Sequence, residues 1–303
     1  HSIRRRQRQM CIRDSLKGEQ LAEMFDMYNA GALAFSDNMR PIHNSGLFSR
    51  ALLYAKNFNG LIISFPYEEK ISPNGLINEG VVSTKLGLEG IPDLSEELMV
   101  NRDLLINKYH KGRLHFNILS SKKSLEHIEV AKKTQNNLSC GTSIFHLLFD
   151  DEIINQFDNR FKILPPFRTK EDRNALLEGV KNGTIDVITS YHQPNEKETT
   201  NVEFSLSPFG SIGTQICFPL ALTYLKEYIG LEKIVQCMSI NPRTILQCEV
   251  PIIKEGYGAN MTLFNPDKKW IYNKNNNTSM SENTGLFGTC LLYTSPSPRD
   301  SDS

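Results

Sequence analysis

The segment Tyr191-His192-Gln193-Pro194 holds the residues whose types and position come closest to a hydrolytic site. It follows directly on the apolar stretch Ile185–Ser190, which has the length and composition of a buried strand. A carboxylate or an imidazole at the end of such a strand can bind a metal ion and carry a proton during hydrolysis. The first residue of the four is a tyrosine, which supplies neither a carboxylate nor an imidazole. The segment therefore raises the question of whether any reaction takes place.

Both ends of the chain resemble translated nucleotide adapters. Arg5–Asp14 and Cys290–Asp300 each match, codon by codon, an adapter used in transposase-based sequencing libraries. We therefore expect residues 1–15 and 290–303 to be adapter artefacts, and we leave them out of the predicted fold. The alternatives are a basic nucleic-acid arm at the start of the chain and a Ser/Pro-rich tail at its end.

Without these ends the chain is slightly acidic, with a net charge of about −3. This balance gives no electrostatic reason to expect nucleic acid or an acidic membrane as a partner. No apolar stretch approaches the roughly 20 residues that span a bilayer, and no secretion signal is visible once the arginine-rich start is set aside. These observations predict a cytoplasmic protein with one large domain.

Apolar periodicity alternates between helix and strand along most of the chain. Predicted helices lead into predicted strands four times: 21–28 into 32–35, 47–56 into 60–65, 94–109 into 114–119, and 125–133 into 138–144. Thr169 and Asp172 predict a capping box for a helix that ends at Val180 and precedes the strand Thr184–Ser190. Strands separated by helices pair in parallel, so the fold is an α/β barrel or a doubly wound sheet. The lack of a Gly-rich phosphate loop after any strand favours the barrel.

The last third of the chain has a different pattern. Helices are predicted near 214–228 and 231–238, and residues 249–272 have the composition of short β-like pieces separated by Gly and Pro. We therefore expect a partial barrel at 16–240, followed by a C-terminal helix and a small β subdomain at 241–289.

An ordered series of motifs along residues 16–289 resembles the dihydroorotases of the amidohydrolase superfamily. The motifs include Ala34-Phe35-Ser36-Asp37, Asn78-Glu79-Gly80, Pro165-Pro166-Phe167-Arg168, Pro208-Phe209-Gly210 and Asn241-Pro242. The resemblance implies a distorted (β/α)8 TIM barrel of the amidohydrolase type with a small β subdomain. We expect its N-terminal strands to be missing from this sequence.

The resemblance also implies a chemistry. Active members bind one or two zinc ions that lower the pKa of a bound water. The resulting hydroxide attacks the ring amide of dihydroorotate, and an aspartate on the last strand carries the proton. The zinc ligands come from several strand ends: a His-x-His pair, an acidic group or modified lysine, two single histidines and that aspartate. The His-x-His pair is absent from this sequence and would belong to the missing N-terminal part.

Three of the implied ligand positions hold apolar or aromatic residues. Ile118 and Phe145 stand at the two histidine positions, and Tyr191 stands at the aspartate. A buried histidine or carboxylate without its metal costs about 1–3 kcal/mol, whereas Ile, Phe and Tyr can fill the vacated space. The substitutions therefore predict a filled metal site with no catalytic residue and no cofactor. The alternative for Ile118 and Phe145 is a register shifted by one residue, which would break the flanking matches at Ser120 and Leu147.

A residual pocket has five candidate residues, namely Asp37, Arg168, His192, Phe209 and Gly210. Asp37 lies in the acidic segment that can supply a metal ligand. Arg168 and His192 match motif positions that face the family's substrate pocket or its rim. Either could instead be an ordinary residue at the top of the barrel, held by hydrogen bonds.

Three functions stay open. The favoured one is an inactive dihydroorotase homologue of pyrimidine biosynthesis that forms an oligomer and scaffolds aspartate transcarbamoylase, as inactive relatives do in the family. The second is an active zinc-dependent dihydroorotase or cyclic-amide hydrolase, whose reduced metal site combines the missing His-x-His pair with Asp37. The third is a module that binds a dihydroorotate-like small molecule through His192, Arg168 and Phe209.

Overall fold

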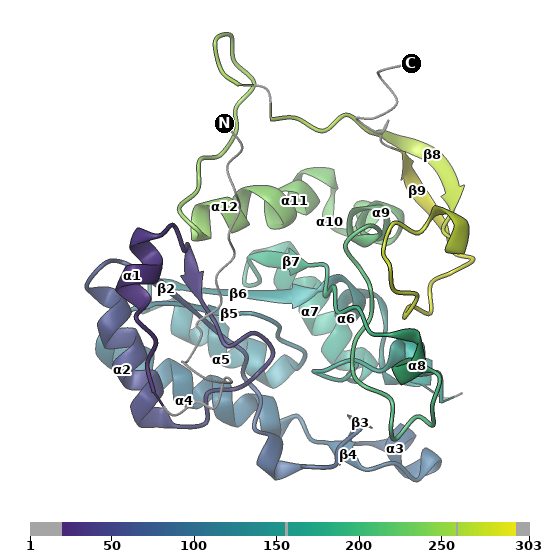
Figure 1. Ribbon diagram of the computed structural model, residues 1–303, viewed down its shortest axis with the longest axis horizontal. Coiled ribbons are helices and arrows are strands. Elements are labelled where there is room, and N and C mark those ends of the chain that lie inside the picture. Colours follow the sequence, from purple (N-terminus) through teal and green to yellow (C-terminus); the bar gives the residue numbers. More distant parts are fainter. Residues whose placement is uncertain (1–19, 155–156, 259, 295–303) are drawn as a thin grey trace. The chain divides into compact units, whose positions relative to one another are not determined.

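The computed structural model describes residues 20–154, 157–258 and 260–294 (Figure 1). The predicted artefact at 1–15 lies outside these residues. The chain forms two compact units: the first runs to Glu152 and includes Pro165–Val187, and the second holds Ile153–Leu164 and the chain from Ile188 on. The boundary that we expected between residues 240 and 241 does not coincide with this division and stays a prediction.

A parallel sheet forms the centre of the first unit. Its strands follow the order β1-β2-β5-β6-β7, with β1 at Ala34–Phe35, β2 at Leu61–Ser64, β5 at Arg113–Phe116, β6 at Leu138–Ser143 and β7 at Val187–Thr189. The pairs β1–β2, β2–β5 and β5–β6 are all parallel. Every residue of β6 is buried, as expected of a parallel strand covered on both faces. The predicted alternation of helices and parallel strands is confirmed.

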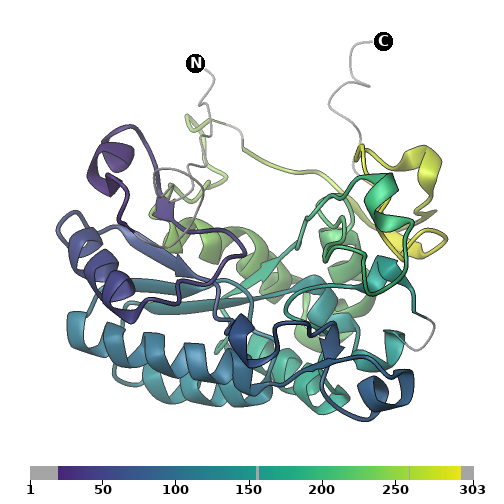
Figure 2. The same cartoon turned by 60° about the horizontal axis from the view of Figure 1, so that its bottom comes forward.

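Helices cover one face of this sheet. They lie in a row in which α2 (Ser45–Lys56) packs on α4 (Leu94–His110), α4 packs on α5 (Lys122–Lys132), and α5 packs on α7 (Lys170–Asn182). Figure 2 shows this row along the sheet. The helices begin at polar caps: Asn44 and Ser121 each accept a backbone N–H, and Thr169 and Asp172 form the predicted capping box.

Shorter elements complete the first unit. They are α1 at Met24–Asn29, β3 at Ile77–Asn78, α3 at Val81–Leu86, β4 at Gly90–Ile91 and α6 at Ile144–Leu148. Strands β3 and β4 form a separate parallel pair. The predicted strand at 114–119 is shorter than expected, because β5 ends at Phe116. The amides of Asn117 and Leu119 still donate to the carbonyls of Ser64 and Gly141, and the chain then leads into the cap of α5.

The second unit is helical at its start and has an antiparallel hairpin at its end. Its helices are α8 (Lys197–Thr200), α9 (Cys217–Tyr224), α10 (Lys226–Ile229), α11 (Leu231–Val235) and α12 (Asn241–Ile245), and a π-helical turn at Gln236–Ile240 joins the last two. Strand β8 (Asn265–Ile271) pairs with β9 (Cys290–Thr294). Among the described residues of the chain, every helix is too short or too polar to cross a membrane.

Two expectations about the second unit need correction. The β-like pieces expected from residue 249 on are reduced to β8, because the described residues at 249–264 have no strand to pair with. Residues 290–294, which we left out of the fold, form β9 and bury Leu291. The sequence Cys-Leu-Leu-Tyr-Thr has the aromatic, β-branched and apolar residues of a strand, whatever its origin. Its origin in an adapter stays a prediction.

Candidate functional site

The carboxyl ends of β1, β2, β5 and β6 lie at one edge of the parallel sheet, which is where barrel enzymes carry their active sites. The residues just beyond these ends are, in the order of the strands, Asp37, Phe65, Ile118 and Phe145. All four side chains are at most 4% exposed. This edge therefore holds one buried carboxylate and three apolar side chains without a metal-binding atom.

Phe65 is a residue that the sequence analysis did not consider. It directly follows Ser64, the last residue of β2, and packs in the core with its ring 6.2 Å from that of Tyr67. Its position at a strand end was the available signal, because residues there face the active site of a barrel. Phe65 adds a third apolar side chain to the two that we predicted at this edge.

Within the described part of the chain, the buried carboxyl group of Asp37 has an oxygen atom without a hydrogen-bond partner. Its Oδ1 atom accepts no hydrogen bond within the described structure. Burial raises the pKa of the Asp37 carboxyl from 3.8 to about 6, and the positive charge of Arg40 offsets part of that rise. An unsatisfied buried carboxylate is costly, so this atom is where a ligand or a proton would be most favourable.

The two histidines that remain beside Ile118 and Phe145 are occupied by structural contacts. His146 Nδ1 lies 2.7 Å from Ser143 Oγ, and its Nε2 lies 3.0 Å from the Pro165 carbonyl oxygen. His115 Nδ1 lies 2.8 Å from Ser139 Oγ. Burial lowers the pKa of both imidazoles to about 4, so both are neutral at pH 7. A register shifted by one residue would thus offer His146 as a ligand with both ring nitrogens already bonded.

The described residues do not fit the zinc site that the resemblance implies. Within residues 20–154, 157–258 and 260–294, no three side chains of His, Cys, Asp or Glu gather closely enough to hold a metal ion. A zinc site needs three or four such ligands in tetrahedral positions. Asp37 alone does not make one, and no catalytic step can be routed through a metal on these residues.

Tyr191 follows β7 and belongs to the second unit. Its phenol accepts a hydrogen bond from the Leu164 amide at 2.8 Å and donates one to the Leu164 carbonyl at 3.0 Å. Burial raises the pKa of the Tyr191 phenol, so it stays protonated and keeps this donor. Its backbone has a φ of 48°, in the left-handed region that costs a non-glycine residue about 1 kcal/mol or more. The convergence of Tyr191 with Ile118 and Phe145 on one site stays a prediction.

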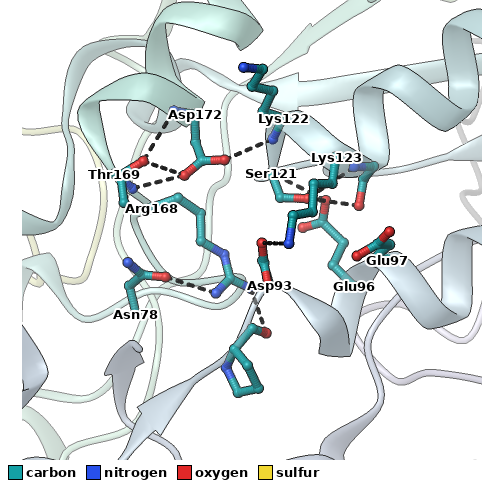
Figure 3. A network of polar contacts seen from close by, with 12 residues as sticks. Asn78, Asp93, Glu96, Glu97, Ser121, Lys122, Lys123, Arg168, Thr169 and Asp172 are labelled. Atoms are coloured by element: carbon teal, nitrogen blue, oxygen red, sulfur yellow. Dashed lines mark hydrogen bonds and ion pairs between the residues drawn. The ribbon is translucent and has the colours of Figure 1, made fainter. Parts of the chain in front are cut away.

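Arg168 is buried in the first unit and bonded in several directions (Figure 3). Its guanidinium donates to Asn78 Oδ1 at 2.9 Å, to the carbonyls of Ile91 and Pro92, and to Ser120 Oγ at 3.2 Å. Burial lowers the pKa of Arg168, and the attraction of Glu96 opposes that change. Of the two roles that we considered for Arg168, this geometry favours the structural one.

Glu96 is a buried carboxylate that the sequence analysis also missed. It accepts hydrogen bonds from the amides and hydroxyls of both Ser120 and Ser121, which lie at the turn into α5. Asp172 accepts a bond from the Lys122 amide at the same turn (Figure 3). The polar groups near Arg168 therefore hold the β5–α5 connection in place.

His192 is exposed and lines a pocket in the second unit. Its Nδ1 accepts hydrogen bonds from the amides of Gly213 and Thr214, at 3.2 and 3.4 Å, which leaves the proton of the neutral ring on Nε2. Partial burial lowers the pKa of His192. The pocket has a volume of about 280 Å³, and its walls include Gln215, Tyr272 and the loop Asn277–Ser279. Of the five residual-pocket candidates, His192 is the one that lines it.

Phe209 and Gly210 surround a buried lysine instead. Lys162 donates from Nζ to the carbonyls of Phe204 and Ser207, both at 2.7 Å, and lies 4.9 Å from the centre of the Phe209 ring. Burial lowers the pKa of Lys162 to about 8. Gly210 has a φ of 144° and donates its amide to the Lys162 carbonyl at 2.9 Å. The signal for this cluster was a single lysine inside the apolar run Phe161–Leu164.

Sequence comparisons with known proteins all find dihydroorotases. A family model described as dihydro-orotase-like matches residues 8–124. The dihydroorotase of Caldicellulosiruptor saccharolyticus is 38% identical to this chain over 93% of the chain and 66% of its own length. The dihydroorotase of Ruminiclostridium cellulolyticum is 35% identical over 94% of this chain and 67% of its own length. The dihydroorotase of Aquifex aeolicus is 37% identical over 91% of this chain and 65% of its own length. The chain thus spans about two thirds of the length of the curated relatives it matches.

Solved structures agree on the fold. The L-hydantoinase (dihydropyrimidinase) of Arthrobacter aurescens superposes with a TM-score of 0.78 at 19% identity, over 90% of this chain and 64% of that one. The dihydropyrimidinase of Brevibacillus agri gives a TM-score of 0.73 at 16% identity, over 89% and 62%. These structures support the predicted fold class, a TIM barrel of the amidohydrolase type, although the five strands described in this chain do not close into a barrel.

Proposed function

The chain belongs to the dihydroorotase family of the amidohydrolase superfamily, and from that premise we propose that it is a dihydroorotase-like protein of pyrimidine biosynthesis that has lost the hydrolytic reaction. The observation that carries this proposal is the edge of the sheet where ligands would stand. Phe65, Ile118 and Phe145 occupy the ends of β2, β5 and β6, all of them buried and apolar. Hydrolysis of a cyclic amide by this family's chemistry needs a metal-activated water, and these side chains cannot hold the metal.

The experiment that tests the lost reaction measures metal and turnover together. The full-length protein is purified with zinc in the medium, and its zinc content is measured by mass spectrometry while carbamoyl aspartate and dihydroorotate are each offered as substrate. We expect far less than one zinc per chain and no interconversion. The dihydroorotase of Aquifex aeolicus, prepared in the same way, is the positive control. One zinc per chain together with turnover would overturn the proposal.

We also propose that the retained fold serves as a structural partner, with aspartate transcarbamoylase as the partner that the family resemblance implies. The chain keeps its capped helices and its buried polar network, although apolar residues fill the positions of the metal ligands. This combination fits a structural protein better than an enzyme that is losing its fold. Co-purification of the two proteins from one expression culture, followed by measurement of the complex mass, tests this role. Elution of the two proteins as separate peaks at micromolar concentration would contradict it.

Asp37 is the one observation that favours the second candidate, an active hydrolase with a reduced metal site. Its unbonded Oδ1 could accept a metal ion whose other ligands come from a part of the protein outside this chain. In that case the full-length protein would contain zinc, and Asp37→Asn would lower the zinc content. An Asp37→Asn variant with the same zinc content as the wild type would remove this candidate.

A further inference from the structure

The pocket beside His192 lies entirely within the second unit. Its other walls are residues 212–216, which precede α9, Tyr272, which follows β8, and the loop at 277–279. None of the residues at the strand ends of the parallel sheet is among these walls. The pocket is therefore a second candidate site, separate from the one that hydrolysis would use.

Side-chain hydrogen bonds hold the loop on one side of the pocket in place. Gln215 donates from Nε2 to the Asn276 carbonyl at 2.7 Å, and its Oε1 accepts from the amide and the hydroxyl of Thr278 at 2.9 and 3.1 Å. The hydroxyl of Tyr272 donates to Asn277 Oδ1 at 3.0 Å. Because the protein's own bonds fix these walls, little binding energy would be lost to ordering the loop around a ligand.

The walls of the pocket carry no formal charge. Among the described residues of the chain, those that line it include no Asp, Glu, Lys or Arg. His192 is neutral at pH 7, because partial burial lowers its pKa, and burial raises the pKa of the Tyr272 phenol to about 12. An ion that entered would lose hydration without gaining an opposite charge. The pocket therefore favours an uncharged ligand.

The side chains of these walls have hydrogen-bond donors to spare. His192 accepts the amides of Gly213 and Thr214 at Nδ1, so its proton is on Nε2, and no side chain or carbonyl of the described residues accepts that proton. The Ser279 hydroxyl accepts from the Ser281 amide at 3.2 Å, which leaves its own proton available. Donors of this kind predict a ligand that offers a carbonyl oxygen.

The size of the pocket and the apolar part of its walls limit the rest of the ligand. A volume of about 280 Å³ equals that of roughly nine water molecules in the liquid, which take about 30 Å³ each. This space suits one small ring and is below the range of pockets for drug-sized molecules. Ile212, Ile216 and Tyr272 supply the apolar surface on which such a ring can pack.

We propose that this pocket binds a small uncharged carboxamide, whose carbonyl oxygen accepts a hydrogen bond from His192 Nε2 and whose apolar ring packs on Ile212 and Ile216. A carboxamide is uncharged at pH 7, and its N–H groups can donate to the hydroxyl of Thr214, which also lines the pocket. The proposal goes beyond the function proposed above and does not depend on whether the hydrolytic reaction is lost.

Benzamide and benzoate form a matched pair of probes, because they share one ring and nearly one size but differ in charge. Saturation-transfer difference NMR at pH 7 measures the binding of each to the full-length protein. We expect a dissociation constant on the order of 1 mM for benzamide, as for a weakly bound fragment, and binding about tenfold weaker for benzoate. Benzoate that binds as tightly as benzamide, or no saturation transfer to benzamide at about 10 mM, overturns the proposal.

His192→Asn tests the assigned hydrogen bond. The asparagine Oδ1 can accept from the amides of Gly213 and Thr214 in place of Nδ1, whereas the shorter side chain leaves no donor at the position of Nε2. We expect the variant to bind benzamide about fivefold more weakly, with an unchanged thermal melt. His127→Asn, at a half-exposed histidine of the first unit, is the control. Equal affinity of the two variants for benzamide overturns the role of His192.

A measurement on the wild type avoids any change of the fold. The histidines of the full-length protein are labelled with a nitrogen isotope, and the Nε2 signals are followed while benzamide is added. We expect the signal of His192 to shift with the same dissociation constant as the saturation transfer, and the signal of His127 to stay in place. Saturation transfer to benzamide without a shift at His192 would put the ligand elsewhere and overturn the site.

Discussion

The hydroxyl of Tyr191 satisfies both backbone polar groups of Leu164, since it accepts from the amide and donates to the carbonyl. An aspartate on the same backbone would be too short to reach Leu164, and an ionised carboxylate could not donate to the carbonyl in any case. Tyrosine therefore fills the position with a ring and also completes the hydrogen bonding of a chain segment 27 residues away. These two bonds give Tyr191 a structural role in the second unit.

Tyr191→Phe keeps the ring and removes the hydroxyl. We expect it to lower the free energy of unfolding by about 1–3 kcal/mol, because two partly buried backbone groups of Leu164 lose their partner. Urea unfolding at pH 7 measures the change. Tyr224→Phe is the control, because Tyr224 is exposed. Equal stability of the two variants would mean that the Tyr191 hydroxyl contributes nothing to the fold.

Asp37→Asn should stabilise the protein at neutral pH. The folded pKa of Asp37, about 6, lies above the value near 3.8 expected in the unfolded chain. Folding therefore favours the protonated carboxyl, and the wild type loses stability as pH rises from about 4 to above 6. The variant cannot ionise and avoids this loss, so its advantage should be near zero at pH 4 and on the order of 1–3 kcal/mol at pH 7.

Unfolding in urea at several pH values from 4 to 8 measures this advantage. Asp26→Asn, at an exposed carboxyl on α1, serves as the control and should change stability little at any pH. The opposite sign at pH 7, with the Asp37 variant less stable than the wild type, would indicate that the carboxylate has a cation bound to it. The experiment thus separates the filled site from the reduced metal site.

The periodicity of the sequence was sufficient for the order of the elements but not for the long-range polar contacts. Thr169 and Asp172 are three residues apart, and their capping box could be predicted because both partners lie within one turn. Arg168 bonds to Asn78, ninety residues away, and no local pattern indicates that pairing. The same limit applied to Lys162, whose carbonyl partners lie more than forty residues further along. Strand β9 was missed because its residues were judged by their resemblance to an adapter and not by their strand propensity.

Lys162→Met should destabilise the second unit. Methionine retains most of the apolar stem but removes the donors to the carbonyls of Phe204 and Ser207, and the contact with the Phe209 ring loses its charge. Two buried carbonyls without partners predict a loss of about 1–3 kcal/mol. Urea unfolding, followed by the fluorescence of the single Trp270 in this unit, measures it. Lys170→Met, at an exposed lysine, is the control, and a loss of the same size there would contradict the role of Lys162.

Arg168→Lys separates a structural role of Arg168 from a ligand-binding one. A lysine ammonium cannot reach Asn78, the Ile91 carbonyl and Ser120 from one position, because it lacks the rigid fork of a guanidinium. The buried Glu96, which attracts the Arg168 guanidinium, also loses that group. Breaking a buried charged network in this way typically costs about 3–5 kcal/mol, so we expect the ligand-free variant to unfold at a much lower urea concentration. Arg160→Lys, at the exposed ion pair with Asp158, should cost less than about 1 kcal/mol. If the two variants were equally stable and Arg168→Lys lowered only the affinity for carbamoyl aspartate, Arg168 would be a ligand-binding residue.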